Sequence, residues 1–87
     1  MHYFITVYGK VQGVWYRKHT LEKAIALGLK GYVKNQSNGS VYIEAEGSKE
    51  QLKELLTWCA TGPELASVTQ VDHTEGTPKH FDRFEIR

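Results

Sequence analysis

The dipeptide Asn38-Gly39 restricts the fold of this chain more than any other feature, because it separates two segments of strand-like composition. Asn-Gly is the strongest short-range signal for a β-hairpin, since both residues accept the positive φ of a type I′ turn. Residues 29–35 and 40–46 are therefore predicted to pair as antiparallel strands. The second segment alternates strictly, with Val41, Ile43 and Ala45 predicted to face a core and Tyr42, Glu44 and Glu46 predicted to face water.

Two further segments have the periodicity of helices. The first places Leu21, Ala24 and Ile25 on one apolar face and is predicted to end at Gly28. The second begins with Ser48 and Gln51 in the arrangement of a capping box. Its apolar stripe is Leu52, Leu55, Leu56 and Cys59, and Gly62-Pro63 is predicted to end it.

The remaining segments are strand-like. Residues 3–8 alternate and open the chain with a strand. Val68 and Val71 are three residues apart, which predicts a β-bulge or a late strand start. Residues 74–79 are predicted to be a turn-rich connection, and Phe84 and Ile86 mark a short final strand.

The resulting order is β-α-β-β-α-β with one more short strand. It predicts an α+β fold, the ferredoxin-like α/β sandwich, with two helices on one face of an antiparallel sheet. A length of 87 residues suits one domain, residues 1–87. Many unrelated functions use this fold, so the fold alone does not indicate an activity.

Composition excludes several classes of protein. The net charge of +1 argues against a nucleic-acid partner, which usually requires a strongly basic domain. No apolar run is long enough to cross a membrane. The single cysteine, Cys59, fits a reducing compartment, predicted to be the cytoplasm, and is expected to be a buried, inert thiol. A monomer is expected for so small a domain.

The stretch from Gly9 to Arg17 joins the first strand to the first helix. Its glycines let the loop bend sharply, and a helix N-terminus offers unpaired N–H groups and a positive dipole end. Arg17 adds a guanidinium that can pair bidentately with phosphate or carboxylate. This combination predicts an anion site, against the alternative that Arg17 is a solvated surface arginine.

Asn35, at the end of the predicted second strand, is the other candidate. It is either a turn asparagine bonded to its own backbone or a polar group that shares one end of the sheet with the loop. The four histidines have no metal-ligand spacing, so surface or loop histidines and no metal or other cofactor are expected.

An alternative function is RNA binding. Tyr8, Tyr32 and Tyr42 are predicted to share the outer face of the sheet, where RNA-recognition domains stack bases on aromatic rings. Glu44 and Glu46 on the same face would repel phosphates, so this reading is disfavoured.

Two motifs resemble signatures of the acylphosphatase family. The first is Val7-x-Gly9-x-Val11-Gln12-Gly13-Val14-x-Tyr16-Arg17, and the second is Gly31-Tyr32-Val33-Lys34-Asn35. The resemblance covers essentially the whole chain. Tyr16 stands where the family more often has phenylalanine, and the added hydroxyl is expected to leave the loop shape intact.

The resemblance implies metal-free hydrolysis of acyl phosphates, which are carboxyl-phosphate mixed anhydrides, to a carboxylate and inorganic phosphate. It further implies that the loop Gln12, Gly13, Val14, Trp15, Tyr16 and Arg17 binds the phosphoryl group through backbone amides and the arginine. Asn35 would orient the attacking water. The alternative is a non-catalytic module of the same fold that binds anions or RNA.

Overall fold

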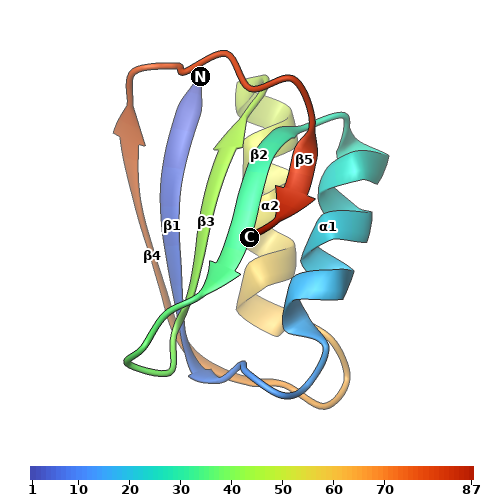
Figure 1. Cartoon of the computed structure of the whole chain (residues 1–87), viewed down its shortest axis with the longest axis vertical. Coiled ribbons are helices and arrows are strands. Elements are labelled where there is room, and N and C mark those ends of the chain that lie inside the picture. Colours follow the sequence, from blue (N-terminus) through green and yellow to red (C-terminus); the bar gives the residue numbers. More distant parts are fainter.

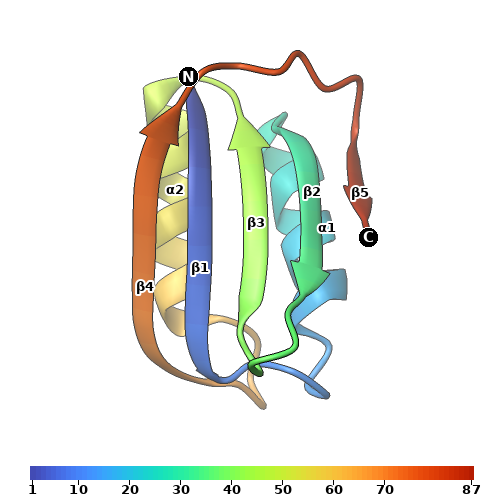
Figure 2. The same ribbon diagram turned by 60° about the vertical axis from the view of Figure 1, so that its left-hand side comes forward.

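The computed structural model describes all 87 residues and contains seven elements in the predicted order (Figure 1). They are β1 (His2–Lys10), α1 (Tyr16–Leu27), β2 (Lys30–Asn35), β3 (Val41–Glu46), α2 (Lys49–Thr61), β4 (Ser67–Gly76) and β5 (Phe84–Ile86). Both helices cover the same face of the sheet (Figure 2). The predicted ferredoxin-like α+β architecture is therefore confirmed. Neither helix is long and apolar enough to cross a membrane.

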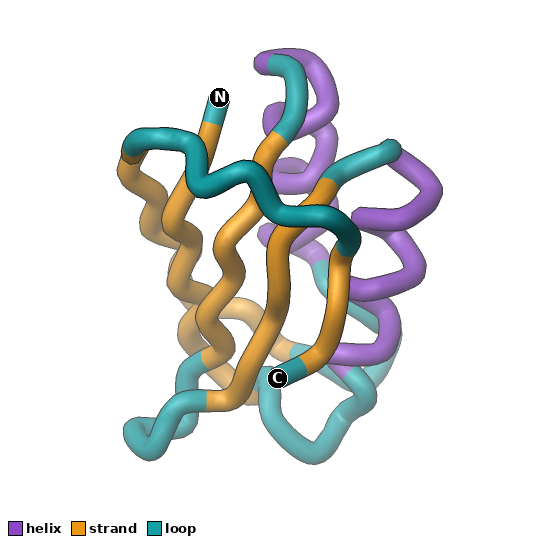
Figure 3. Tube along the Cα trace, turned by 45° about the horizontal axis from the view of Figure 1, so that its top comes forward, coloured by secondary structure: helices purple, strands orange, loops and turns teal.

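The sheet has the strand order β4-β1-β3-β2-β5. The first four strands pair antiparallel, but β5 pairs parallel to β2, with Gly31 opposite Phe84 and Val33 opposite Ile86. The sheet is thus mixed, and the prediction of a purely antiparallel sheet is wrong for this edge. A long connection after β4 brings the chain back so that β5 runs in the same direction as β2 (Figure 3).

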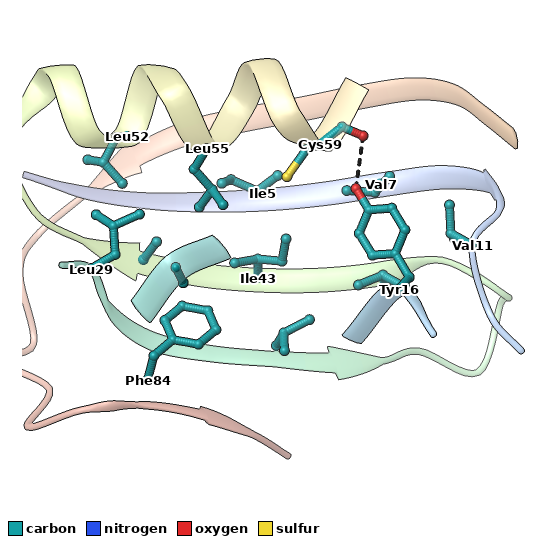
Figure 4. Packing of buried hydrophobic residues seen from close by; sticks show 14 of the residues in the cluster. Ile5, Val7, Val11, Tyr16, Leu29, Ile43, Leu52, Leu55, Cys59 and Phe84 are labelled. Atoms are coloured by element: carbon teal, nitrogen blue, oxygen red, sulfur yellow. Dashed lines mark hydrogen bonds between the residues drawn. The ribbon is translucent and has the colours of Figure 1, made fainter. Parts of the chain in front are cut away.

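The predicted hairpin is present, with Val33 opposite Ile43 and Asn35 opposite Val41. Asn38 Oδ1 holds the turn by accepting from the backbone N–H and the hydroxyl of Ser40, at 3.0 and 2.6 Å. The inward set of β3 joins the core between the sheet and the helices (Figure 4). Hairpin register therefore places Asn35 at the end of β2, where the strand meets the turn.

The second helix follows its prediction closely. Ser48 accepts from the backbone N–H of Gln51 at 3.1 Å, and the Gln51 side chain accepts from the Ser48 N–H at 2.8 Å, which completes the capping box. Leu52, Leu55 and Cys59 are fully buried. This helix therefore starts with the amides of Ser48 and Gln51 satisfied and packs its apolar stripe on the sheet.

The first helix differs from its prediction in one residue. Its buried positions are Tyr16, Thr20 and Ala24, which lie four residues apart on one face. Ile25 is 60% exposed, so its predicted place on the buried face is wrong. Because α1 presents its narrow Tyr16–Thr20–Ala24 row to the core, an apolar residue one position further around the helix remains in water.

The predicted β-bulge is present where β1 and β4 end their pairing. The register shifts between Tyr8 and Gly9, so that Gly9 lies opposite Val68 while Val7 lies opposite Val71. Gly9 has φ +120, and a Cβ added there would lie 2.1 Å from the carbonyl oxygen of Ser67. Only glycine fits this approach of the two backbones. The bulge thus lies at the strand end where the loop begins.

The connection between β4 and β5 is largely a strap and not a turn. Strand β4 extends to Gly76, so the predicted turn-rich segment at 74–79 begins too early. Residues 77–83, which we call the C-terminal strap, cross the face of the sheet opposite the helices (Figure 3). Residues predicted to face water on that side are consequently covered.

The strap closes over a cluster of charged and polar side chains on β1, β2 and β3. His2 is fully buried and Glu44 is 3% exposed, so the predictions of a surface His2 and a water-facing Glu44 are both wrong. His2 Nε2 lies 2.9 Å from Glu44 Oε1, and His2 Nδ1 lies 2.7 Å from Glu46 Oε2. Each ring nitrogen of His2 therefore lies within hydrogen-bonding distance of a carboxylate oxygen, which ties β1 to β3 on this side of the sheet.

The two carboxylates of this cluster have several donors each. Glu44 accepts from the hydroxyls of Tyr32 and Tyr42 and from Lys79 Nζ at 3.0 Å. Glu46 accepts from three consecutive backbone N–H groups of the strap, those of residues 79, 80 and 81. Burial alone would raise the pKa of each carboxyl group, but these donors and His2 outweigh it and lower both pKa values to about 2.

Candidate active site

A cleft of about 220 Å³ lies where the loop after β1, the start of α1 and the ends of β2 and β5 meet. The loop and the end of β2 lie at the same end of the molecule, opposite the strap (Figure 1). The cleft is lined by Val11, Gly13, Trp15, Tyr16, Arg17, Lys18, Asn35 and Ile86. None of these residues is acidic, so the cleft is suited to an anion.

The loop has an unusual backbone. Gly13 has φ +75 and Trp15 has φ +66, so two residues of this short loop are left-handed. The backbone N–H groups of residues 12–15 donate to no backbone carbonyl. Trp15 occupies the N-cap position of α1 without a capping side chain, and the first turn of the helix holds no acidic residue. The helix therefore presents uncapped amides and an uncompensated positive dipole end to the cleft.

Arg17 is one of two cationic residues that line the cleft, with Lys18 as the other. It lies in the first turn of α1 and is exposed. No carboxylate of the chain lies within ion-pairing distance of its guanidinium. The two other arginines, Arg83 and Arg87, both pair with Glu85. Arg17 is thus the arginine left free to bind an anion from solution.

Asn35 faces the same cleft from the end of β2. Its amide oxygen Oδ1 is buried and has no hydrogen-bond partner within the protein. The alternative of a turn asparagine whose oxygen bonds its own backbone is therefore not observed. A buried acceptor without a partner is costly, which makes it a natural site for a hydrogen-bonded ligand or water.

The six residues of the predicted phosphate loop do not all line the cleft. Gly13, Trp15, Tyr16 and Arg17 do. Val14 is 5% exposed and belongs to the core, which anchors the middle of the loop. Gln12 Nε2 donates to the carbonyl oxygens of Gln36 and Ser40, at 2.8 and 2.9 Å. The Gln12 side chain thus ties the loop to the hairpin next to Asn35.

Tyr16 lines the cleft but is only 1% exposed, and its side chain belongs to the core. The hydroxyl donates to the backbone carbonyl of Cys59 at 2.8 Å, so the start of α1 is joined to the last turn of α2 (Figure 4). Burial raises the pKa of the Tyr16 hydroxyl far above its ordinary value. Burial also raises the pKa of the Cys59 thiol to about 12, although the nearby Tyr16 hydroxyl acts in the opposite direction. Both groups are therefore neutral at ordinary pH, and the expected burial of Cys59 is found.

Sequence reasoning missed three residues of the cleft, namely Val11, Lys18 and Ile86. Lys18 follows Arg17 directly, so its place in the first helical turn was an available signal. Ile86 is far away in sequence and enters only because β5 pairs with β2. Its contribution depends on the strap, for which the sequence carries no clear pattern.

The other candidate groups lie elsewhere. His19, His73 and His80 are exposed, as predicted. The structure contains no group of three or more His, Cys, Asp or Glu side chains that could hold a metal ion. On the outer face, the Tyr32 and Tyr42 hydroxyls donate to Glu44, and Phe81 and Arg87 contact the Tyr32 ring. These rings are occupied by the chain itself, which disfavours base stacking.

Comparison with known proteins gives the family. A sequence model of the acylphosphatase family matches residues 3–86. This chain belongs to the acylphosphatase family. The acylphosphatase of Pasteurella multocida (strain Pm70) is 46% identical over 82 residues, which are 93% of this chain and 91% of that protein. The acylphosphatase of Thermotoga maritima is 46% identical over 83 residues, 95% of this chain and 92% of that protein.

Solved structures of the family agree. An acylphosphatase from Coxiella burnetii superposes with a TM-score of 0.96 at 37% identity, covering 99% of this chain and 90% of that one. The acylphosphatase from Bacillus subtilis gives a TM-score of 0.95 at 33% identity, covering 99% and 97%. The chain is accordingly an acylphosphatase-type hydrolase, which converts acyl phosphates to a carboxylate and inorganic phosphate.

Proposed function

We propose that the cleft between the loop, α1 and β2 is the active site for this hydrolysis. One observation carries the proposal: the unpaired Arg17, the loop residues Gly13 and Trp15 with their free amides, and Asn35 with its unpartnered Oδ1 line the same cleft. In the proposed arrangement Arg17 and the backbone amides of the loop from Gln12 to Arg17 bind the phosphoryl oxygens. Asn35 holds the attacking water at the neighbouring strand end.

The chemistry requires little beyond placement and charge stabilisation. Phosphoryl transfer passes through a loose transition state with negative charge on the equatorial oxygens. Arg17 and the loop amides are donors fixed in advance around that charge, which is the arrangement that lowers such a barrier most. The departing group is a carboxylate, which is stable as an anion and leaves without protonation.

Asn35 has a limited role in this mechanism. Its carboxamide is neutral, and its oxygen can accept a hydrogen bond from water but not a proton at ordinary pH. The water oxygen attacks phosphorus while the bond from phosphorus to the acyl oxygen breaks. One proton of the water passes to a phosphoryl oxygen of the substrate and the other stays on the attacking oxygen, so the products are a carboxylate and dihydrogen phosphate. No side chain has to act as a general base.

No metal or cofactor has a place in this proposal. The charge that a metal ion would supply comes from Arg17 and from the amides at the start of α1. The absence of acidic residues around the cleft also means that no carboxylate competes with the substrate for Arg17.

The proposal is tested at Asn35, because binding and turnover should separate there. We expect Asn35→Ala to lower kcat for benzoyl phosphate by about 10²-fold, since the water loses its orientation. The inhibition constant of inorganic phosphate should change little, because Arg17 and the loop remain. The control Gln70→Ala removes an exposed carboxamide of β4 that lies outside the cleft and bonds only Asp72, and it should retain kcat. Full activity of Asn35→Ala would rule out its role in positioning water.

We also propose that residues 1–87 act as one domain, as a monomer and in the cytoplasm. The family match over residues 3–86 supports a single functional unit, and the buried, reduced Cys59 suits a reducing compartment. The expected partners are small acyl phosphates, phosphate and similar anions, without nucleic acid or membrane.

A further inference from the structure

Trp15 is the residue of the cleft that the proposed phosphoryl chemistry does not explain. Its backbone is left-handed, with φ +66 and ψ +21, a conformation that is strained for a bulky side chain and costs glycine nothing. Its indole is 63% exposed although it is one of the largest apolar groups of the chain. Strained conformations persist where the surrounding structure or the function requires them. A smaller residue would suit this position better if only loop shape mattered.

A second exposed apolar residue lies across the same cleft. Ile86 is 41% exposed and lines the cleft together with Trp15 and Arg17. Its position is fixed by the parallel pairing of β5 with β2, opposite Val33. Two exposed apolar side chains from distant parts of the chain therefore border the site at which the phosphoryl group is proposed to bind.

Lys18 holds the indole in place. Its Nζ lies 4.9 Å from the centroid of the Trp15 ring, a cation–π geometry. The lysine stem adds apolar surface beside the ring while its ammonium stays in solvent. The indole is thus oriented at the rim of the cleft by a neighbour one helical turn into α1.

The substrate itself demands a surface of this kind. In an acyl phosphate the acyl carbon is joined to phosphorus through a single oxygen, so the acyl group must lie directly beside the bound phosphoryl group. With the phosphoryl group on the loop amides and Arg17, the nearest side chains for the acyl part are those that border the same cleft. Apart from the phosphate-binding groups, the exposed ones are Trp15, Lys18 and Ile86, of which Trp15 and Ile86 are apolar.

We propose that Trp15 and Ile86 form the acyl-binding surface and that Trp15 determines a preference for flat, aromatic acyl groups. The inference rests on the proposed function of the cleft. An aromatic acyl group can stack on the indole and bury the apolar surface of a whole ring, whereas an acetyl group can bury only one methyl group. The selectivity therefore belongs to the acyl end of the substrate and is separate from phosphate recognition.

The test compares two substrates that share the phosphoryl group, benzoyl phosphate and acetyl phosphate. The measured quantity is the ratio of their kcat/KM values in the wild type and in Trp15→Gly, which accepts the left-handed backbone without strain and removes the indole. We expect this ratio to fall about 10-fold, and to remain near the wild-type value in Trp15→Phe, which keeps an aromatic ring. Ile86→Ala should lower the ratio in the same direction by a smaller factor.

The control is Ile25→Ala, which removes an equally exposed apolar residue of α1 that does not line the cleft and should leave the ratio unchanged. Equal loss of both substrates in Trp15→Gly, or an unchanged ratio in both the Trp15 and Ile86 variants, would overturn the proposal. So would a loss of phosphate inhibition as large as the loss of benzoyl phosphate turnover, since Trp15 would then act on phosphate binding. Full activity of Arg17→Ala in the same assay would instead refute the proposed site.

Discussion

The two ends of the sheet hold polar clusters that are built in opposite ways. Under the strap, His2, Glu44 and Glu46 are buried, and the charges are paired with one another and with strap donors. At the other end, Arg17 has no carboxylate partner and Asn35 Oδ1 has no partner at all. A satisfied cluster contributes to holding the fold together, whereas unsatisfied groups at a cleft are available to a ligand.

The N-termini of the two helices also differ in whether their polar groups are satisfied within the protein. At α2 the capping box satisfies the amides of Ser48 and Gln51, and Glu50 lies in the first turn. At α1 there is no capping side chain and no acidic residue in the first turn. A capping side chain typically stabilises a helix by about 1 kcal/mol, and α1 lacks this stabilisation whereas α2 has it. The difference leaves the start of α1 available to the anion of the proposed site, whereas the start of α2 is satisfied within the fold.

The largest expected effect comes from removing the unpaired arginine. We expect Arg17→Ala to reduce kcat/KM for benzoyl phosphate by at least about 10²–10³-fold, the usual consequence of losing one preorganised donor. The free energy of unfolding should change by less than about 0.5 kcal/mol, because the side chain makes no ion pair within the fold. Steady-state kinetics and urea unfolding of the same preparation measure the two quantities.

Arg83→Ala is the matched control for this variant. Arg83 is exposed and pairs only with Glu85 at 3.8 Å, away from the cleft. It should change neither activity nor stability appreciably. If Arg17→Ala unfolded more easily but kept its kcat/KM, Arg17 would support the fold and would not bind substrate, which would contradict the role given to this end of the sheet.

The opposite pattern is expected at the strap. Glu44→Ala leaves His2 and Lys79 without their shared carboxylate and should lower the free energy of unfolding by about 3 kcal/mol, because one partner of a buried charge network is removed. The activity of the molecules that remain folded should be unchanged, since Glu44 lies at the far end of the sheet. Kinetics at a temperature well below the melting transition, with unfolding followed by circular dichroism, separates the two effects. A large loss of kcat in fully folded protein would show that the ends are coupled.

These two ends were not equally predictable. The loop, the helix start and the hairpin are local features: Asn38-Gly39, the glycines of the loop and the capping box each act within a few residues. They were sufficient to place Arg17 and Asn35 as candidates. Two motifs that resemble the acylphosphatase signatures then supplied the reaction, which local physical chemistry alone did not indicate.

The strap cluster, by contrast, depends on contacts distant in sequence. Alternation in β3 predicted Glu44 in water, because the pattern says which residues share a face but not what covers that face. His2 and Glu44 are 42 residues apart, and the strap that buries them has no periodic pattern. The same limit hid Ile86, which reaches the cleft only through the parallel pairing of β5. Long-range covering segments are thus the part of this fold that sequence patterns missed.

Acid should weaken the strap end. The hydrogen bonds to Glu44 and Glu46 lower both pKa values to about 2, against about 4.3 in an unfolded chain. Their contribution to stability is therefore complete above about pH 4.5 and is lost as the pH falls toward 2, when the folded carboxylates must take up protons. We expect a loss on the order of 2 kcal/mol in urea unfolding between pH 5 and pH 2.5. The Glu44→Gln variant should start less stable and lose less over this interval, and an equal loss in both proteins would contradict the assignment.

The smallest expected effect is at Tyr16, which belongs to both regions because the residue lines the cleft while its hydroxyl donates to the Cys59 carbonyl. Tyr16→Phe leaves one carbonyl in the last turn of α2 without its donor and should lower the free energy of unfolding by about 1 kcal/mol. The value of kcat/KM should stay within about twofold, because the hydroxyl points away from the cleft into the contact between the helices. Unfolding and kinetics of this single variant therefore locate the boundary between the binding end and the supporting core. A drop in activity without a drop in stability would show that the hydroxyl takes part in the reaction. The boundary between the binding end and the supporting core would then lie between Tyr16 and Cys59, and not between the loop and Tyr16.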